Sequence, residues 1–307
     1  MGNRGHNVRA AHHAGLPCHS TGSQGHAQIQ VFGKIMSPAR PHRPFVSPAI
    51  QLGVLGLVVL YTLSPLATIL VESLIPGRNQ APSDSLLTLR AYRDAVADST
   101  LRQAIFNSLV IAVTTGLLSG ILGFLSARLV HELSARLVLA CMIVTSIPAI
   151  LPPIISGFSL HVYYQLIGID GTLIGILAAH VIYVSPIAFF LLYIAESGLN
   201  PEIEDCARNM GASEMQIAAQ IAFPQLANVF VGASTICALV SWNEFMITWF
   251  VSGFQKTMPT VIYGMMGNTL DPSLYAAGTL VTLLSFVLMV SSAVLMRKQI
   301  MYGLARR

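Results

Sequence analysis

Long runs of apolar residues alternate with shorter polar segments along most of the chain. Six runs are long enough to cross the hydrocarbon core of a bilayer, which takes about 20 helical residues at a rise of about 1.5 Å each. They cover residues 50–71, 109–130, 137–160, 173–194, 229–251 and 275–296. The third run is interrupted by Pro148, Pro152, Pro153 and Gly157, and such breaks need neighbouring helices or a wet cavity to satisfy the freed backbone. The pattern predicts an all-α membrane protein with six transmembrane helices.

Composition and charge support this prediction. The chain is 54% hydrophobic and 10% charged, whereas soluble domains carry about 25% charged residues. Of the 17 Lys and Arg residues, twelve fall on the side that both termini of a six-span chain share, and five fall on the other. Because Lys and Arg concentrate in cytoplasmic loops, we expect both termini in the cytoplasm. The net charge of +4 then follows from topology and gives no reason to expect nucleic acid as a partner.

The N-terminal segment differs from the rest of the chain. It contains six of the nine histidines together with many Gly, Ser and Arg residues, and it lacks the apolar core of a signal peptide. We expect a disordered cytoplasmic tail over residues 1–44 and a second cytoplasmic tail over residues 301–307. The histidines are irregularly spaced and the four cysteines show no paired spacing. Neither a metal site nor a disulfide framework is therefore predicted.

The most strongly patterned polar segment lies between the fourth and fifth apolar runs. Its sequence is EDCARNMGASEMQIAAQIAFPQL, residues 204–226. Just before it, Asn200 is a good N-cap and Pro201 suits the first helical position, and two glutamates in the first turn favour the helix dipole. Gly211 is predicted to end this helix with a positive φ. The segment therefore begins with a short, well-defined helix.

A second short helix is predicted to follow. Ser213 and Gln216 have the spacing of a capping box, and Pro224 marks the return to the membrane. Ile217 and Ile221 then share one face of the helix, with alanines beside them. Two interpretations remain open: the face docks a partner protein, or it packs on the cytoplasmic ends of the protein's own spans.

This segment resembles the EAA loop of the membrane subunits of ABC importers. The family pattern is Glu-Ala-Ala, three residues, Gly, nine residues, Ile, one residue, Leu-Pro. The chain keeps the spacing throughout, from Asp205 through Gly211 and Ile221 to Pro224. It departs in having Asp for Glu, Cys for Ala, and Phe for Leu, and each departure keeps the approximate character of the residue.

The resemblance extends beyond the loop. FNSLVIA at residues 106–112 looks like the entry to the family's core domain, and SWNEFMITWFVSG, TMPTVIYGMM and DPSLYAAGT, which begin at residues 241, 257 and 271, are similar to the spermidine/putrescine branch. It covers about residues 45–300, with a core of about 101–297. It implies a type I ABC importer permease (MetI-like) fold with cytoplasmic coupling helices.

Membership of this family would imply that the chain lies in the bacterial inner membrane and works with several partners. These are a dimer of ATPase subunits, a second permease subunit that is a different chain, and an extracytoplasmic solute-binding protein. The chain has no G-x-x-x-x-G-K-[ST] phosphate loop, so it is not expected to be an enzyme or to bind a cofactor, and ATP and Mg²⁺ would be used by the separate ATPase. By analogy, the residues expected to couple to the ATPase are Glu204, Asp205, Cys206, Ala207, Arg208, Gly211, Ile221 and Pro224.

The expected translocation path involves Trp242, Asn243 and Glu244 in the fifth apolar run. An ionised carboxylate at the centre of a span costs about 2.5–3.5 kcal/mol on insertion scales. Glu244 is therefore expected to face a cationic cargo, to pair with a neighbouring helix or to lie near the outer interface. The spermidine/putrescine branch often has Asp-Glu where this chain has Asn243 and Glu244, which weakens the polyamine interpretation.

Other polar and aromatic residues near the spans have structural interpretations. Trp242, Trp249 and Tyr263 suit core packing or interfacial anchoring, and His161 and His180 suit hydrogen bonding inside the helix bundle.

The resulting functional interpretation is a permease subunit that passes a small polar solute, with a polyamine favoured. Alternatives are another cargo, such as an aminophosphonate or ferric ion, or a stand-alone ion-coupled carrier. The carrier would need ionisable residues along a continuous path, and the spans are nearly free of charge apart from Glu244.

Overall fold

The computed structural model describes residues 47–75, 88–131, 133–267 and 272–305 of the chain. The expected tail of residues 1–44 lies outside this range. The chain divides into two compact units, Met1–Thr62 and Leu63–Arg307. The described part of the first unit is the beginning of one long helix, α2. All packing described below belongs to the second unit.

The described residues form helices joined by turns and short loops. In chain order the elements are α2 (Pro48–Leu74), α3 (Arg90–Ala97), α4 (Ser99–His131), α5 (Ala135–Ile150), α6 (Pro153–Ile167), α7 (Leu173–Glu196), α8 (Pro201–Asn209), α9 (Glu214–Ile217), the π-helical turn η1 (Ala218–Ala222), α10 (Phe223–Trp242), α11 (Met246–Val251), α12 (Met258–Met266) and α13 (Pro272–Ala305).

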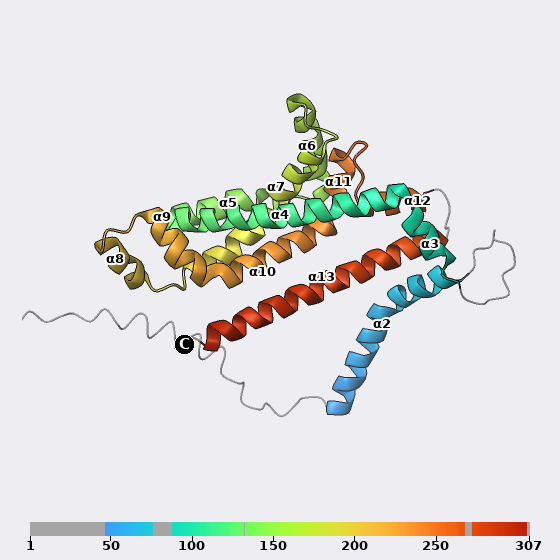
Figure 1. The fold of residues 1–307 in the computed structure, drawn as a ribbon, viewed down its shortest axis with the longest axis horizontal. Coiled ribbons are helices and arrows are strands. Elements are labelled where there is room, and N and C mark those ends of the chain that lie inside the picture. The colour runs from blue at the N-terminus through green and yellow to red at the C-terminus, as the bar shows by residue number, and fades with distance from the viewer. Residues whose placement is uncertain (1–46, 76–87, 132, 268–271, 306–307) are drawn as a thin grey trace, which may run out of the picture. The chain divides into compact units, whose positions relative to one another are not determined.

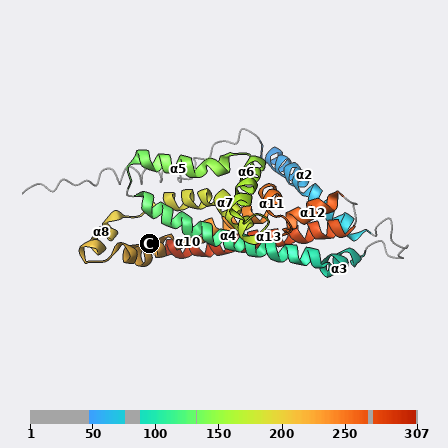
Figure 2. The ribbon, with the colours of Figure 1, turned by 90° about the horizontal axis from the view of Figure 1, so that it is seen from above.

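Three long helices, α4, α7 and α10, lie side by side in both views (Figures 1 and 2). Glycines of α4 allow the close approach. A Cβ at Gly120 would lie 2.1 Å from Oγ of Ser234 in α10, and a Cβ at Gly123 would lie 2.7 Å from the backbone of Ala188 in α7. Helices in lipid depend on small residues of this kind, because lipid supplies no hydrophobic drive between them. The glycines of α4 therefore set the spacing of the bundle.

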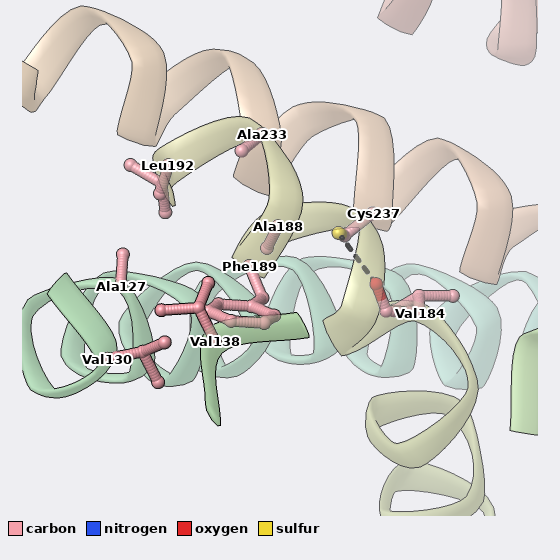
Figure 3. Packing of buried hydrophobic residues seen from close by; sticks show 9 residues of the cluster. All are labelled: Ala127, Val130, Val138, Val184, Ala188, Phe189, Leu192, Ala233 and Cys237. Carbon is pink, nitrogen blue, oxygen red and sulfur yellow. Dashed lines mark hydrogen bonds between the residues drawn. The ribbon is translucent and has the colours of Figure 1, made fainter. Parts of the chain in front are cut away.

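Buried side chains fill the space between these helices and α5 (Figure 3). The cluster consists of Ala127, Val130, Val138, Val184, Ala188, Phe189, Leu192, Ala233 and Cys237. The Cys237 thiol donates a weak hydrogen bond to the Val184 carbonyl at 3.4 Å. This cysteine therefore serves as a small core residue.

The ends of the bundle carry different elements. α8 lies at one end, and α3 and α12 lie at the other (Figures 1 and 2). At the second end, Ala95, Met258 and Ala276 belong to one buried cluster that joins α3, α12 and the start of α13. The polar segments that the sequence places on opposite sides of the membrane therefore lie at opposite ends of the helices.

The predicted spans agree with the structure in part. Within the described residues, four helices are long and apolar enough to cross a membrane: Ala49–Leu74, Ser99–His131, Leu173–Glu196 and Glu214–Trp242. A bent pair of helices raises the number to up to five. The sixth predicted run lies inside α13, whose apolar part in this range is shorter, Pro272–Val287. Because α13 continues to Ala305, most of the expected C-terminal tail is helical.

The interruption predicted in the third run is a sharp bend between two helices. α5 ends at Ile150, α6 begins at Pro153, and the two helices are bent by 95°. Leu151 and Pro152 between them have ψ angles of 143° and 130°. Each of them precedes a proline, and a residue in that position is pushed out of the helical region. The two consecutive prolines therefore account for the bend.

The fifth predicted span, residues 229–251, is wrong in its extent. The long helix ends at Trp242, and α11 begins at Met246. The Asn243 side chain donates to a carbonyl one turn back at 2.8 Å, and the Glu244 carboxylate accepts from a backbone N–H of α11 at 2.9 Å. The two polar side chains thus satisfy the backbone on both sides of a break, instead of standing in the middle of a span.

We expect Gly123→Ala to lower the thermal stability of the protein. The new methyl group would overlap the backbone of α7, and overpacking of this kind costs about 1–3 kcal/mol. Gly264→Ala in α12 is the matched control, since nothing lies within 4 Å of a Cβ added there. Thermal unfolding of the detergent-purified protein should show a lower midpoint for Gly123→Ala alone. Equal midpoints would contradict the close contact of α4 and α7.

Candidate functional site

We call residues 200–222 the elbow, because a short helix and the start of a long one meet there. Asn200 caps α8 by accepting from the Glu202 N–H at 3.1 Å, and Pro201 occupies the first helical turn. α8 ends with Met210 as its C-cap, and Gly211 has φ 88°. The caps and the positive φ predicted from the sequence are confirmed. The turn itself requires a glycine-like backbone at residue 211.

The start of the second helix is also as predicted. The Gln216 N–H donates to Oγ of Ser213 at 3.3 Å, and the Ser213 N–H donates to Oε1 of Gln216 at 2.9 Å. This reciprocal pair is the capping box, and it satisfies two backbone donors that a helix start leaves free.

The prediction that this second helix is short and ends at Pro224 is wrong. α9, η1 and α10 form one helix from Glu214 to Trp242. Pro224 has no N–H, and its ring crowds the carbonyl four residues earlier. A π-helical turn takes up the mismatch: the Phe223 N–H reaches back five residues to the Ala218 carbonyl. Local π-type bonding of this kind lets a proline stay inside a membrane helix.

An ion cluster anchors the elbow to the bundle. Arg128, near the end of α4, donates to Glu196 at the end of α7 and to both carboxylate oxygens of Glu204 in α8, the latter at 2.7 and 3.2 Å. The Glu196 side chain is 2% exposed, and a buried carboxylate needs a paired charge. Glu204, expected to contact a partner, is instead turned inward with 15% of its side chain exposed. Arg128 thus ties three elements together.

Sequence reasoning missed Arg128 and Glu196 as site residues. In the sequence, Arg128 contributes to the charge balance of the predicted cytoplasmic side, and Glu196 belongs to no motif. One signal was present: each is a lone charge where an apolar run ends, and both runs end on the same predicted side. Their pairing depends on α4 and α7 being neighbours, which the sequence pattern does not state.

A second set of charges spans the bend of the elbow. Arg208 donates to Asp205 at 2.8 Å within α8 and to Glu214 at 2.6 Å across the turn. The hydrogen bond with Glu214 raises the pKa of Arg208 above its usual value. Exposed ion pairs contribute little to stability. We therefore expect this pair to act mainly on the angle between α8 and α9.

Two interpretations were open for the apolar face of the second helix, and burial distinguishes them for part of it. Ile217 and Ala222 are fully buried, because the first turns of the long helix are held against the bundle. The interpretation that this face packs within the chain therefore holds for these two residues. Met210 and Met215 are exposed instead, at 83% and 77%. Met210 borders a hollow of about 390 Å³, which is lined by Ala207, Met210, Gly211, Ala212, Gln216, Gln220 and Ile221.

This hollow suits a protein partner. Methionine side chains are unbranched and polarizable, and they adapt to the shape of an apposed surface. Gly211 lines the hollow, and nothing lies within 4 Å of a Cβ added to it. Cys206 is also exposed, and Ala207 is buried. Of the predicted coupling residues, Ala207, Gly211 and Ile221 share the hollow.

The three residues expected along a path lie around the break after α10. Trp242 is 2% exposed and donates its indole N–H to Oγ of Ser285 in α13 at 2.8 Å, a placement that favours anchoring. Asn243 is exposed and Glu244 is half-buried. Glu244 is satisfied in part by the backbone of α11, at Ile247. The carboxylate therefore has a local structural role as well.

Both candidate histidines are hydrogen-bonded, as predicted. The two ring nitrogens of His180 lie 2.7 Å from Oγ of Ser241 and from Oγ1 of Thr248, so this buried side chain joins α7, α10 and α11. His161 lies 2.9 Å from a carboxylate oxygen of Asp170. The contact between His180 and Thr248 fixes the position of α11 beside the break.

Comparisons with known proteins agree with this arrangement. The sequence profile of the family described as "binding-protein-dependent transport system inner membrane component" matches residues 112–300. The spermidine/putrescine transport system permease protein PotC of Haemophilus influenzae is 26% identical over 67% of this chain and 81% of its own length. The family match, over residues 112–300, contains the whole elbow.

Solved structures give the same fold. A bacterial ABC transporter involved in the import of the acidic polysaccharide alginate superposes with a TM-score of 0.62 at 17% identity, covering 82% of this chain and 98% of that one. The alginate transporter in complex with its alginate-bound periplasmic protein gives a TM-score of 0.60 at 14% identity, covering 80% and 91%. At these identities the likeness shows the fold alone.

Proposed function

The chain belongs to the family of binding-protein-dependent transport system inner membrane components, and from that premise we propose that it is the permease subunit of an ATP-driven importer for polyamines. In this proposal the chain provides half of the membrane path. A separate ATPase dimer drives it, and an extracytoplasmic binding protein delivers the solute. The permease domain is residues 45–300 and crosses the inner membrane six times, with both termini in the cytoplasm.

The observation that carries the proposal is the elbow. Its two helices meet at a glycine with φ 88°, its bend is spanned by Arg208, and its exposed surface has a hollow bordered by the exposed Met210. A solvated loop needs neither this order nor an exposed apolar rim. Contact with the ATPase is proposed for Asp205, Cys206, Arg208, Gly211 and Ile221, while Glu204 and Pro224 act from inside by holding the elbow and shaping its helix.

Transmission into the membrane follows from the ion cluster. Arg128 connects the elbow to the ends of α4 and α7, which pack closely along their length. A displacement of α8 by the ATPase would therefore pull on both helices, and it would act directly on α10 because the elbow's second helix continues into it. The second permease subunit, proposed to be a different chain, would complete the path.

The polyamine cargo is supported by the relatives rather than by a fold likeness. The matching permease of Haemophilus influenzae is described as transporting spermidine and putrescine. In this chain Asn243 and Glu244 stand at a break between two helices, where polar groups are accessible. Glu244 is proposed to face the passing cation with the carboxylate oxygen that α11 does not use.

The test is uptake by the assembled importer. The chain should be purified with its second permease, ATPase and binding protein, and placed in liposomes with ATP inside or outside. We expect putrescine or spermidine to stimulate ATP hydrolysis and to be taken up, whereas aminophosphonate and ferric ion are not. Stimulation by one of these two instead would overturn the polyamine cargo. Flux through liposomes holding this chain alone would overturn the importer itself.

A further inference from the structure

Three aromatic rings gather beside the break between α10 and α11. Phe245 immediately precedes α11, Trp249 lies within it, and Tyr263 lies in α12. We call these three residues the ring cluster. Ring centroids are 4.7 Å apart for Phe245 and Tyr263, 5.1 Å for Trp249 and Tyr263, and 5.6 Å for Phe245 and Trp249. Separations in this range are those of interacting rings, so the cluster is one platform built from two helices.

The ring cluster is not a core. Trp249 is 44% exposed and Tyr263 is 52% exposed, whereas Trp242 is 2% exposed. Trp242 also has a partner for its indole N–H in Ser285. Packing therefore accounts for Trp242 fully, and it leaves the exposed faces of the ring cluster unexplained.

A lysine ammonium already lies on this platform. Nζ of Lys256 is 5.8 Å from the centroid of the Trp249 ring, within the range of a cation–π contact. The lysine backbone is held on α4: its carbonyl accepts from Nδ2 of Asn107 at 3.0 Å, and the Met258 N–H donates to Oγ of Ser108 at 2.8 Å. The main chain is therefore fixed while the lysine side chain is exposed, so the ammonium can leave the ring without unfolding the segment.

We infer that the ring cluster is an ammonium-binding seat on the translocation path, which Lys256 fills in this conformation and which an amino group of the transported solute takes in turn. This inference rests on the proposed function and replaces the anchoring role expected for Trp249 and Tyr263. The negative face of an aromatic ring attracts any cation of this kind. A resident lysine keeps the seat occupied between solutes, and a path needs binding that is weak enough to release its cargo.

The same chemistry has a second source in the ammonium headgroup of phosphatidylethanolamine. A tryptophan and a tyrosine at the membrane interface would meet such headgroups. If the seat holds a headgroup, phosphatidylethanolamine should displace Lys256, and if it holds the solute, a soluble amine should do so. The experiment below therefore varies the lipid and the soluble amine separately.

Tryptophan emission gives a direct measurement. The chain has two tryptophans, and only Trp249 belongs to the ring cluster. The purified full chain, in nanodiscs of phosphatidylglycerol, should be titrated with putrescine and, as an uncharged control of the same length, with 1,4-butanediol. We expect a saturable change in emission with putrescine only, and no change in Trp249→Phe, where Trp242 is the sole tryptophan.

Lys256 supplies the decisive variants. In Lys256→Met the seat is empty, so the putrescine concentration at half-saturation should fall by about two- to fivefold, which is the effect of one exposed cation–π contact. Lys256→Arg keeps a cation on the ring and should bind putrescine as the parent does. Equal responses to putrescine and butanediol, or weaker binding by Lys256→Met, would overturn the inference.

Two further outcomes separate the competing explanations. If phosphatidylethanolamine in the nanodisc changes the emission and abolishes the putrescine response, the seat holds a lipid headgroup and the solute site is refuted. If the assembled importer takes up no putrescine while the emission response persists, the polyamine cargo fails and the ammonium seat stands. If the importer takes up putrescine but the emission does not respond, the polyamine cargo stands and the ammonium seat is refuted.

Discussion

Replacing Gly211 with Asp is expected to abolish coupling between ATP hydrolysis and uptake while leaving the protein in the membrane. Residue 211 has φ 88° and open space around an added Cβ. Asp tolerates this left-handed conformation better than most residues. The fold should therefore survive, while a charge and a side chain enter the hollow where the ATPase is proposed to sit. We expect uptake to fall by at least about tenfold, which corresponds to about 1.4 kcal/mol of lost interaction.

Gly211→Asn is the matched control, because Asn has the same shape and the same tolerance of positive φ without the charge. It should retain more uptake than Gly211→Asp. Membrane insertion is checked by immunoblot, and coupling by solute-stimulated ATP hydrolysis in liposomes. Normal uptake by the Gly211→Asp protein would refute the docking role of the elbow.

Arg128→Gln is expected to be the most destabilising single substitution at the site. It leaves the buried Glu196 without its cation, and removal of one partner from a buried pair typically costs about 3–5 kcal/mol. Glu204 loses the same partner, so the elbow would also detach from α4 and α7. Thermal unfolding in detergent should show a large drop in the midpoint, and uptake should be lost with it.

Two comparisons keep this expectation testable. The double variant with Arg128→Gln and Glu196→Gln removes the uncompensated charge, so it should recover part of the lost stability. Arg136→Gln changes an exposed arginine at the start of α5 and should leave the midpoint near that of the parent. If Arg128→Gln alone unfolds at the parent's midpoint, the ion cluster does not hold the elbow to the bundle.

Where the local sequence alone dictates the geometry, prediction and structure agree. Asn200, Gly211 and the pair Ser213–Gln216 act through backbone groups a few residues away, so their roles were readable without knowledge of the fold. Apolar runs likewise predicted most of the long helices. The run of prolines after Ile150 signalled an interruption, although its angle of 95° came only from the structure.

Predictions failed where a residue's role depended on a distant part of the chain. For the face with Ile217 the sequence left docking and packing within the chain both open, and the continuity of its helix with α10 buries this residue. Glu204 was expected to face a partner, but Arg128 of α4 turns it inward. In the fifth run, the apolar sequence continues beyond Trp242, but the helix ends there. The side chains of Asn243 and Glu244 hydrogen-bond to the backbone on the two sides of the break.

The predictions of a helical membrane protein and of a bend at Gly211 needed only the sequence, because hydrophobic length and capping are local properties of the backbone and its nearest side chains. The tertiary structure alone decided which charges meet and which apolar faces stay open. Arg128, Glu196 and Glu204 pair across 68 and 76 positions of the sequence, and the ring cluster forms only because α11 and α12 come together. Electrostatic and packing energies depend on distances in space, and the linear order of residues does not specify those distances.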